Sequence, residues 1–346
     1  MNILVTGAFG NVGKSTVRSL QERGHSIRIL EKENRAGRRL LRSAGPEVDI
    51  QLGDILNVGD VLQSLDGVDA VIHLAAVIPP AADLNPKAAR LVNVEGTRNL
   101  ISCLQRYGRE RGRAGSPAPK LVFASSIAVY GDRLSTPFIG AYDPPAPNPE
   151  DGYALQKIEA ERLVRASGLD WAILRLSYIA DPYRLKLDPL MFEMPLGTSL
   201  EICDTRDTGV AFAEAAVSSG VSGKVLQIAG GPECRTTYRE YLERMLSLMG
   251  LGRTGLPECA FSTGCFHCGF MDTRESEKLL RYQHHTLDDF YKDVGRIYAS
   301  RRFFVRFLQK SAAKILYLKS PYFMQTLQNR FGSGLTEAAL RFRYLF

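Results

Sequence analysis

Residues 1–23, MNILVTGAFGNVGKSTVRSLQER, carry the strongest structural signal in the chain. A short apolar run rich in branched residues, Met1–Thr6, leads into a turn of the form GxxGxxG and then into a helix-like segment, Lys14–Arg23. Glycines suit this turn because a phosphate must approach the backbone and the helix must pack tightly on the strand. The N–H groups at the start of the helix can bind a pyrophosphate. The segment therefore predicts a dinucleotide-binding strand–turn–helix unit.

The same turn also resembles a phosphate loop. In AFGNVGKS, residues 8–15, Lys14 and Ser15 stand where that loop binds a nucleoside triphosphate and Mg²⁺, although the strict motif has glycine in place of Ala8. On the dinucleotide interpretation, Lys14 and Ser15 are ordinary residues of the first helix. The remainder of the chain favours that interpretation.

Composition places the chain among soluble globular proteins. Its 346 residues are 45% hydrophobic and 23% charged. The first strand begins at Met1, which leaves no room for a signal peptide, and no run of 18 uncharged apolar residues predicts a membrane span. The six scattered cysteines are typical of reduced thiols. We therefore expect a cytoplasmic protein.

The net charge of +7 is concentrated near the C-terminus. Residues 294–336 contain eight basic side chains and no acidic one, so the remaining residues sum to −1. The near-neutral remainder offers no extended basic face, and we expect no nucleic-acid partner.

Predicted strands and helices alternate through the first half of the chain. The predicted strands are Met1–Thr6, Ser26–Glu31, Val48–Leu52, Asp69–Leu74 and Leu121–Ala124, and the predicted helices between them are Lys14–Arg23, Arg35–Ser43, Val58–Leu65 and Pro86–Arg106. This alternation predicts an α/β fold with a doubly wound parallel sheet, and residues 106–120 are expected to form a surface loop. Ligands bind beyond the carboxyl ends of such strands, so the turns that follow them should converge on one site.

Glu31 ends the second predicted strand, 18 residues after Gly13. A carboxylate at this position can accept hydrogen bonds from the adenosine ribose hydroxyls, which favours NAD and repels a 2′-phosphate. Four basic residues follow closely, namely Lys32, Arg35, Arg38 and Arg39, and they leave NADP open as the alternative cofactor. A solvated strand end is the other interpretation of Glu31.

Tyr153 and Lys157 stand four residues apart at the start of a predicted helix and so share one helical face. A neighbouring ammonium group and a positive nicotinamide ring both favour the phenolate and should lower the pKa of Tyr153. Tyr153 is therefore a candidate general acid or base near neutral pH, and a serine at the end of the adjacent strand can hold the same substrate oxygen. Taken alone, the YxxxK pattern is common on helix surfaces.

Seven segments in order resemble the motifs of the extended short-chain dehydrogenase/reductase family, in its NAD-dependent epimerase/dehydratase-like branch. They are TGAFGNVG (6–13), GD (53–54), HLAA (73–76), NVEGT (93–97), SSIAVYG (125–131), YALQK (153–157) and DTGVA (207–211). The resemblance covers residues 1 to about 230, and the shared order of the segments argues against chance and against the triphosphate interpretation of Lys14.

The resemblance implies a Rossmann-type sheet with a small C-terminal substrate lobe, an NAD cofactor and a homodimer. It implies catalytic roles for Ser126, Tyr153 and Lys157, with Ser126 rather than Ser125 as the hydroxyl residue. The implied cofactor-binding residues are Gly7, Phe9, Gly10, Asn11, Val12, Gly13, Glu31, Asp54, Ile55, Leu74, Ala75, Ala76, Asn93 and Lys157.

Departures from the family pattern bear on the substrate. Members that dehydrate sugars carry an Asp-Glu pair where Ile127 and Ala128 stand, which argues against dehydration. Tyr178 replaces the asparagine that contacts the diphosphate of nucleotide sugars, and the Tyr-Ile pair is similar to hydroxysteroid-dehydrogenase-like members. Tyr178 is thus a predicted substrate-binding residue. Apolar side chains in residues 185–196 suit either an apolar pocket wall or ordinary core packing.

The C-terminal third is less informative. We expect a dinucleotide-binding core over residues 1–177, a substrate lobe interleaved with the last sheet strands over 178–300 and a basic helical tail over 301–346. Cys259, Cys265, His267 and Cys268 raise a zinc site, but their spacing is not a paired CxxC set and we expect no metal. Basic residues repeat every four positions within 301–319, which is compatible with peripheral membrane contact or with packing on the protein itself.

The sequence therefore predicts an NAD(P)-dependent oxidoreductase that transfers hydride between the cofactor and a secondary alcohol or ketone, on a fairly apolar small molecule. Two alternatives stay open. One is a nucleotide-sugar epimerase that retains its NAD, and the other is a non-catalytic cofactor-binding scaffold.

Overall fold

The computed structural model describes residues 1–33, 48–113, 115–185, 189–252, 256–300, 302, 305 and 315–331. Seven parallel strands form the central sheet in the order β10-β7-β5-β4-β1-β2-β3. They are β1 Asn2–Thr6, β2 Ser26–Glu31, β3 Val48–Leu52, β4 Ala70–His73, β5 Lys120–Ser126, β7 Trp171–Leu176 and β10 Lys224–Ile228. The predicted doubly wound parallel sheet is confirmed, and the strand order reverses between β1 and β4.

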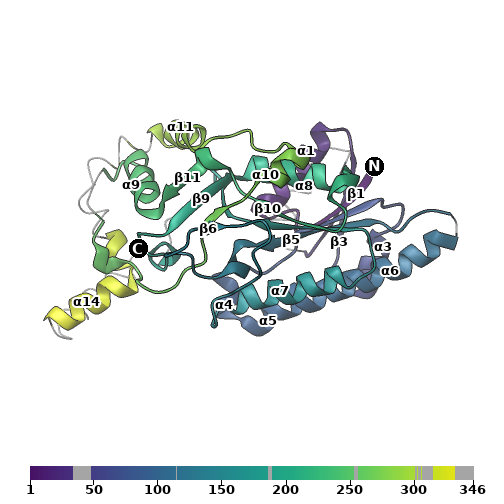
Figure 1. The fold of residues 1–346 in the computed structure, drawn as a ribbon, viewed down its shortest axis with the longest axis horizontal. Helices are drawn as coiled ribbons and strands as arrows, with labels where there is room; N and C mark the ends of the chain where they lie inside the picture. Colours follow the sequence, from purple (N-terminus) through teal and green to yellow (C-terminus); the bar gives the residue numbers. More distant parts are fainter. Residues whose placement is uncertain are drawn as a thin grey trace.

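Helices cover both faces of this sheet (Figure 1). The pleat of β1 sends Leu4 to one face and Ile3 and Val5 to the other. On the Leu4 face lie α3 Val58–Ser64, α6 Thr97–Arg113 and α7 Gly152–Arg165. On the opposite face lie α1 Asn11–Glu22, α8 Thr205–Val217 and α10 Arg274–Leu280. Burial on both faces explains why the central strands are almost continuously apolar.

The predicted helix Pro86–Arg106 is present as three successive elements. They are α5 Pro86–Arg90, a π-helical turn Leu91–Gly96 and α6, which continues to Arg113. The predicted loop over residues 106–120 is therefore wrong in its first half. The Tyr107 hydroxyl accepts a hydrogen bond from the Gly67 N–H (2.8 Å), and the guanidinium of Arg111 bonds the Val68 carbonyl, so α6 is held against the core beyond Arg106. The predicted helix Arg35–Ser43 lies outside the described residues.

A second lobe forms beside the sheet, at the left of Figure 1. Its three strands are β8 Tyr178–Ala180, β9 Ser199–Asp204 and β11 Arg235–Thr237, and α9 Tyr238–Leu248 and α11 Leu287–Ile297 pack with them. β6 Phe138–Ile139 pairs with β12 Phe270–Met271, and α14 Pro321–Phe331 follows near the C-terminus. Most of the segment 301–319, for which peripheral membrane contact and packing on the protein were both left open, lies outside the described residues. No helix in the described part of the chain has the length and apolar character needed to cross a bilayer.

α1 and α8 pack closely although 190 residues separate their contact points. The Ser15 hydroxyl lies 3.2 Å from the Thr205 hydroxyl. A Cβ atom on Gly209 would lie 2.5 Å from the Ser15 carbonyl carbon, so only glycine fits at this crossing. Ser15 thus faces a neighbouring helix, as expected for an ordinary residue of the first helix.

The start of α8 also holds the C-terminal segment. Buried Asp207 accepts hydrogen bonds from the His284 and His285 N–H groups, and its Oδ1 lies 2.5 Å from Nδ1 of His285. The bond to Asp207 raises the pKa of His285. Arg206 bridges Asp204 and Asp293 of α11 at 2.7 and 2.9 Å. The lobe and the main sheet are therefore tied together through the first turn of α8.

Candidate active site

The glycine-rich turn lies against the end of β4. Gly7 has φ +72°, and a Cβ atom there would lie 2.6 Å from the Ala75 nitrogen and the Leu74 carbonyl carbon. A Cβ atom on Gly13 would lie 2.3 Å from the Gly7 carbonyl oxygen. The two glycines let the turn, the strand end and the start of α1 meet at one point. Leu74, Ala75 and Ala76, three of the predicted cofactor residues, follow β4 at this point.

Glu31 ends β2 beside this turn. Its Oε2 accepts a hydrogen bond from the Phe9 N–H (3.3 Å), and burial raises the pKa of the carboxyl group. Nζ of the next residue, Lys32, lies 2.9 Å from Oδ2 of Asp54. Lys32, one of the residues that left NADP open, therefore already has an anionic partner.

The wall formed by α6 and the π-helical turn positions Ile55 and Asn93. The Ile55 carbonyl accepts a hydrogen bond from Asn99 (2.7 Å), and a Cβ atom on Gly96 would lie 2.9 Å from the Ile55 side chain. Buried Asn93 bonds both the N–H and the carbonyl of Val77, and it donates to Oε1 of Gln156 (2.7 Å). Asn93 thus links the segment after β4 to α7.

His73 is a buried residue to which the sequence assigned no role. Its Nδ1 lies 2.7 Å from the Thr6 hydroxyl and its Nε2 lies 3.1 Å from the Thr97 hydroxyl. Burial lowers the pKa of His73 to about 3, so the ring is neutral and joins β1, β4 and α6. The sequence signal for a buried histidine was its position at the end of the otherwise apolar strand AVIH, residues 70–73.

Tyr153 and Lys157 lie on the buried face of α7, as the spacing predicts. The Lys157 Nζ atom donates to the Ala124 carbonyl of β5 (2.8 Å) and lies 5.8 Å from the centre of the Tyr153 ring. Burial lowers the pKa of Lys157 to about 8. Burial raises the pKa of Tyr153, and a hydrogen bond with Ser126 offsets only part of that effect. The lowered pKa expected for Tyr153 is therefore reversed in the protein alone, because desolvation of the phenolate outweighs its favourable contacts.

The two serines at the end of β5 have different surroundings. Ser125 is buried and donates a hydrogen bond to Oε1 of Glu161 (2.6 Å). Ser126 is less buried, accepts a hydrogen bond from the Ala128 N–H (3.2 Å) and contacts Tyr153. Ser126 is thus the serine next to Tyr153, whereas Ser125 belongs to a structural network.

That network includes Glu161, further along α7 than Tyr153, and was not anticipated from the sequence. The Arg175 guanidinium bonds both oxygens of Glu161 (2.8 and 2.7 Å) and the Tyr130 hydroxyl (2.8 Å). Gln227 of β10 also donates to Tyr130 (2.9 Å). Through Glu161 these buried, paired groups hold α7 against β5 and β7, and Tyr130 links them to β10. The available signal was a single arginine inside the apolar strand WAILRL.

Tyr178 and three apolar side chains of the segment 185–196 lie in the second lobe. Tyr178 meets Tyr241 edge-on, with ring centres 6.0 Å apart. Phe192, Met194 and Leu196 are buried in the hydrophobic core of the lobe. Core packing therefore accounts for these three side chains, and the role of Tyr178 in substrate binding stays a prediction.

The cysteine-rich segment is spread out in space. Cys259 and Cys265 are exposed and Cys268 is buried. Nδ1 of His267 lies 2.8 Å from Oδ2 of Asp151. Within the described ranges, no three His, Cys, Asp or Glu side chains form a group that could hold a metal.

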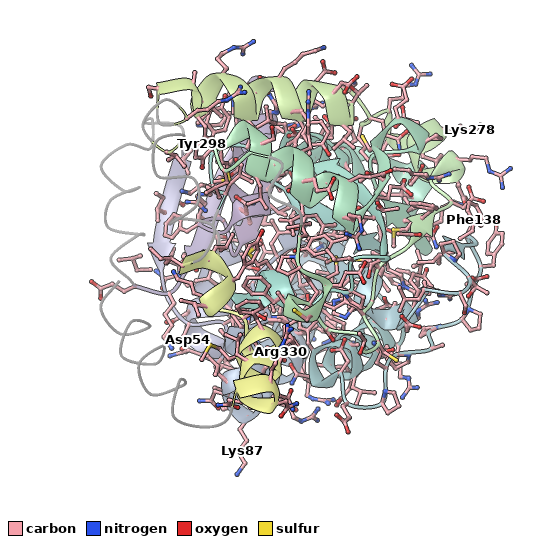
Figure 2. All side chains as sticks on the ribbon, turned by 90° about the vertical axis from the view of Figure 1, so that its left-hand side faces the viewer. Asp54, Lys87, Phe138, Lys278, Tyr298 and Arg330 are labelled. Atoms are coloured by element: carbon pink, nitrogen blue, oxygen red, sulfur yellow. The ribbon has the colours of Figure 1, made fainter. Side chains whose placement is uncertain are left out.

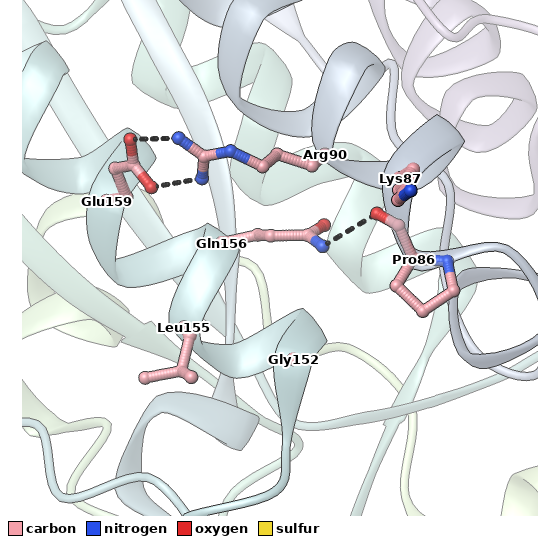
Figure 3. A pocket seen from close by; sticks show the side chains of 7 residues that line it. All are labelled: Pro86, Lys87, Arg90, Gly152, Leu155, Gln156 and Glu159. Atoms are coloured by element: carbon pink, nitrogen blue, oxygen red, sulfur yellow. Dashed lines mark hydrogen bonds and ion pairs between the residues drawn. The ribbon is translucent and has the colours of Figure 1, made fainter.

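A cavity of about 300 Å³ lies on the exposed side of α7 (Figure 3). Its lining residues are Pro86, Lys87, Arg90, Gly152, Leu155, Gln156 and Glu159. Arg90 and Glu159 form a two-pronged ion pair across it, with Nη2 2.9 Å from Oε1. Tyr153 and Lys157 are on the buried side of the same helix, so this cavity is separate from the candidate active site.

Comparisons with known proteins agree with this architecture. The model of the NAD dependent epimerase/dehydratase family matches residues 3–190. The bifunctional UDP-glucose 4-epimerase and UDP-xylose 4-epimerase 3 of Arabidopsis thaliana is 31% identical over 188 residues, which are 51% of each chain. A 3 beta-hydroxysteroid dehydrogenase/Delta 5-->4-isomerase of Mycobacterium tuberculosis is 30% identical over 174 residues, 49% of this chain and 43% of the relative. The chain spans about half the length of the curated relatives it matches.

A solved structure extends the likeness to the second lobe. The dTDP-glucose 4,6-dehydratase DesIV from Streptomyces venezuelae, solved with NAD and TYD bound, has a TM-score of 0.73. The match covers 88% of this chain and 98% of that chain at 24% identity. At this identity the likeness shows a shared fold that includes most of the chain.

Proposed function

Because the chain belongs to the NAD dependent epimerase/dehydratase family, we propose that it transfers hydride between NAD and a secondary alcohol or ketone. The observation that carries this proposal is the arrangement of Ser126, Tyr153 and Lys157. The Tyr153 phenol contacts Ser126, and the Lys157 ammonium is fixed beside it by the Ala124 carbonyl. These three groups are suited to binding one substrate oxygen and moving one proton.

The described residues fit a bound dinucleotide. Gly7 and Gly13 let the turn pack directly against the end of β4 and the start of α1, and the N–H groups of the first turn of α1 begin at this point. Oδ1 of Asn11 is buried and has no hydrogen-bond partner among the described residues, so a ligand donor would satisfy it. NAD, when bound, accepts or supplies the hydride.

Each catalytic side chain then has one task. Ser126 donates a hydrogen bond to the substrate oxygen. During oxidation Tyr153 accepts the hydroxyl proton at its Oη, and during reduction it returns that proton. The Lys157 cation favours the phenolate form of Tyr153.

Glu31 supports NAD rather than NADP. Its carboxylate ends β2 beside the glycine-rich turn, where it would repel a 2′-phosphate. Lys32 pairs with Asp54, so it offers little free charge to such a phosphate. The other three basic residues that follow Glu31, namely Arg35, Arg38 and Arg39, lie outside the described residues.

The two residues that follow Ser126 bear on the type of reaction. Ile127 and Ala128 are buried and apolar, and neither can transfer a proton. Proton abstraction for a dehydration would need an ionisable side chain at this place. We therefore propose simple oxidoreduction of a secondary alcohol or ketone rather than dehydration. Tyr178, in place of the asparagine that contacts the diphosphate of nucleotide sugars, supports a fairly apolar substrate. The similarity to a UDP-glucose 4-epimerase over 188 residues favours a nucleotide-sugar epimerase as the second candidate.

Release of nucleotide from freshly purified, denatured protein is expected to separate these two functions. A dehydrogenase exchanges its cofactor, so we expect little released nucleotide and a rise in melting temperature when NAD is added. Chromatography of the supernatant measures the released nucleotide, and thermal denaturation measures the melting temperature. Near-stoichiometric NAD in the supernatant would contradict the dehydrogenase and favour the epimerase. A melting temperature that rises with NADP but not with NAD would contradict the role of Glu31.

We also propose that the chain forms a homodimer through the surface around the cavity of Figure 3. Leu84 of α4 Ala81–Leu84 is 85% exposed, and Leu91 and Leu155 are about half exposed beside it. The Lys87 side chain extends away from the molecule at this edge (Figure 2). Exposed leucines gathered on neighbouring helices are typical of a subunit interface.

Leu155→Glu is expected to convert this dimer to a monomer, because it places a charge at the centre of the apolar surface. Light scattering after size exclusion measures the mass. Val217→Glu, at an exposed apolar residue of α8 on the opposite face of the sheet, is the control and should leave the mass unchanged. A wild-type mass of about 38 kDa, that of one chain, would contradict the dimer.

A further inference from the structure

The segment that follows β4 runs from the nucleotide turn toward Tyr153. Ala75 lies against Gly7, at the place where the strand order of the sheet reverses. Two residues further on, the Val77 side chain packs against the apolar cluster of Ala82, Ala89, Ala128, Tyr153 and Ala154. Residues 75–77 therefore connect the proposed cofactor site with the candidate general acid or base.

Val77 belongs to no helix or strand, so its backbone groups need hydrogen-bond partners from another part of the chain. The Asn93 side chain supplies both partners. Its Oδ1 accepts a hydrogen bond from the Val77 N–H (2.8 Å), and its Nδ2 donates to the Val77 carbonyl (2.9 Å). One side-chain amide thus fixes the course of the backbone at Val77.

Asn93 is itself fixed at its backbone and at its side chain. Its carbonyl accepts a hydrogen bond from the Thr97 hydroxyl (2.8 Å), and the residue is buried in the π-helical turn. The second hydrogen of Nδ2 is donated to Oε1 of Gln156 (2.7 Å). If the Asn93 amide turned over, its oxygen would face the oxygens of Val77 and Gln156. The Gln156 acceptor therefore stabilises the amide orientation that Val77 needs.

Gln156 reaches this amide from α7. It follows Tyr153 by three residues, so the two side chains are neighbours on the helix surface. Its Nε2 lies 3.5 Å from the Pro86 carbonyl of α5, at the edge of the cavity in Figure 3. This contact is longer than the 2.7 Å bond to Asn93, and it directs the amide so that Oε1 faces Asn93. The Gln156 side chain thus joins α7 to the wall of the proposed cofactor site.

We propose that Gln156 is a positioning residue for the reaction with NAD: its amide oxygen holds Asn93, which in turn holds Val77 and the segment between the nucleotide turn and Tyr153. This inference rests on the NAD-dependent function proposed above. In this role Gln156 touches neither the cofactor nor the reacting atoms. Its loss loosens Val77 and weakens the binding of NAD.

Hydrogen exchange at Val77 tests the first step in the absence of any ligand. Gln156→Met replaces the side chain with one of similar size beside a cavity, so the fold should be retained. The variant leaves one hydrogen of the buried Asn93 amide without an acceptor. The Val77 amide should then exchange about five times faster, which is the effect of one lost hydrogen bond. Mass spectrometry of a peptide that contains residues 74–78 measures this rate.

The affinity for NAD tests the second step. In Gln156→Met the Kd of NAD, measured by calorimetric titration, should rise about fivefold. Gln156→Glu keeps an oxygen acceptor for Asn93 and loses only the donor toward Pro86, so its Kd should stay within about twofold of the wild-type value. In an Asn93→Ala background, Gln156→Met should change the Kd no further, because Gln156 acts through Asn93.

Gln105→Met is the matched control. Gln105 of α6 is half-buried, and its Nε2 donates to the Ser167 carbonyl (2.7 Å), just beyond the C-terminal end of α7. The same substitution there also removes one hydrogen bond, but far from Val77 along the helix. It should lower the melting temperature as Gln156→Met does, and it should leave both Val77 exchange and the Kd of NAD unchanged.

Two results would overturn the proposal and leave the proposed function intact. The first is a wild-type Kd in Gln156→Met, whether or not the melting temperature falls, because Gln156 would then have only a structural role. The second is an equal loss of affinity in Gln156→Glu and Gln156→Met, which would show that the acceptor toward Asn93 has no importance. A wild-type chain that binds no NAD would instead refute the proposed function and this inference together.

Discussion

Tyr153→Phe is expected to reduce turnover about 10³-fold while leaving NAD binding unchanged. The substitution removes only the hydroxyl group, which contacts Ser126 and which, in the proposed function, transfers the substrate proton. The ring packs among Ala128, Ala154 and Ala82, and phenylalanine fills the same volume. The nucleotide turn lies on other elements, so its affinity should not change.

Initial rates of NAD reduction, with a secondary alcohol that the wild type oxidises, measure this loss, and calorimetric titration with NAD measures the binding. Tyr142→Phe is the matched control because Tyr142 is 90% exposed in the loop between β6 and α7, and its rate should equal that of the wild type. Wild-type turnover in Tyr153→Phe would refute the acid–base role. If the wild type and Tyr153→Phe both lack activity but bind NAD normally, the result would support the non-catalytic scaffold.

Gly7→Ala is expected to lower the free energy of unfolding by about 2–4 kcal/mol and to abolish NAD binding. The new methyl group adds two separate costs. A non-glycine residue at φ +72° is strained, and its Cβ atom would overlap backbone atoms of Leu74 and Ala75. The end of β4 must then move, and it forms the floor of the proposed cofactor site.

Gly24→Ala separates these two costs. Gly24 has φ +70°, but a Cβ atom there meets nothing within 4 Å. The free energy of unfolding of Gly24→Ala should fall by only about 1–2 kcal/mol, from strain alone, and the variant should keep its affinity for NAD. Urea denaturation measures both variants. Equal losses in the two variants would show that the contact between Gly7 and β4 has no energetic importance.

Much of the central sheet could be predicted because its signals are local. The strands Ser26–Glu31 and Val48–Leu52 have the predicted bounds, since each is a short segment rich in Val, Ile and Leu that ends at an acidic residue or before a glycine. The α6 helix was predicted too short because its last two turns are basic and contain glycine. Their stabilising contacts, Tyr107 with Gly67 and Arg111 with Val68, join residues about 40 positions apart.

In the candidate site, too, features with a local sequence signal could be predicted and features that depend on distant segments could not. Motif order brought Ser126, Tyr153 and Lys157 together correctly in space. The sign of the Tyr153 pKa shift could not be foreseen, because it depends on burial, which a motif does not reveal. The ion pair of Lys32 with Asp54 and the contact of His267 with Asp151 were also invisible, since each joins segments whose proximity only the folded chain creates.

The close packing of α1 on α8 has a consequence for synthesis of the chain. α1 follows the nucleotide turn directly, yet its partner helix ends at Val217 and the edge strand β10 ends at Ile228. A nascent polypeptide that has left the ribosome only up to residue 200 therefore exposes one apolar face of its central strands. Such high contact order slows folding and prolongs the time in which chaperones are needed. α1 is thus translated well before the helix on which it packs, and it is among the last segments to reach its final environment.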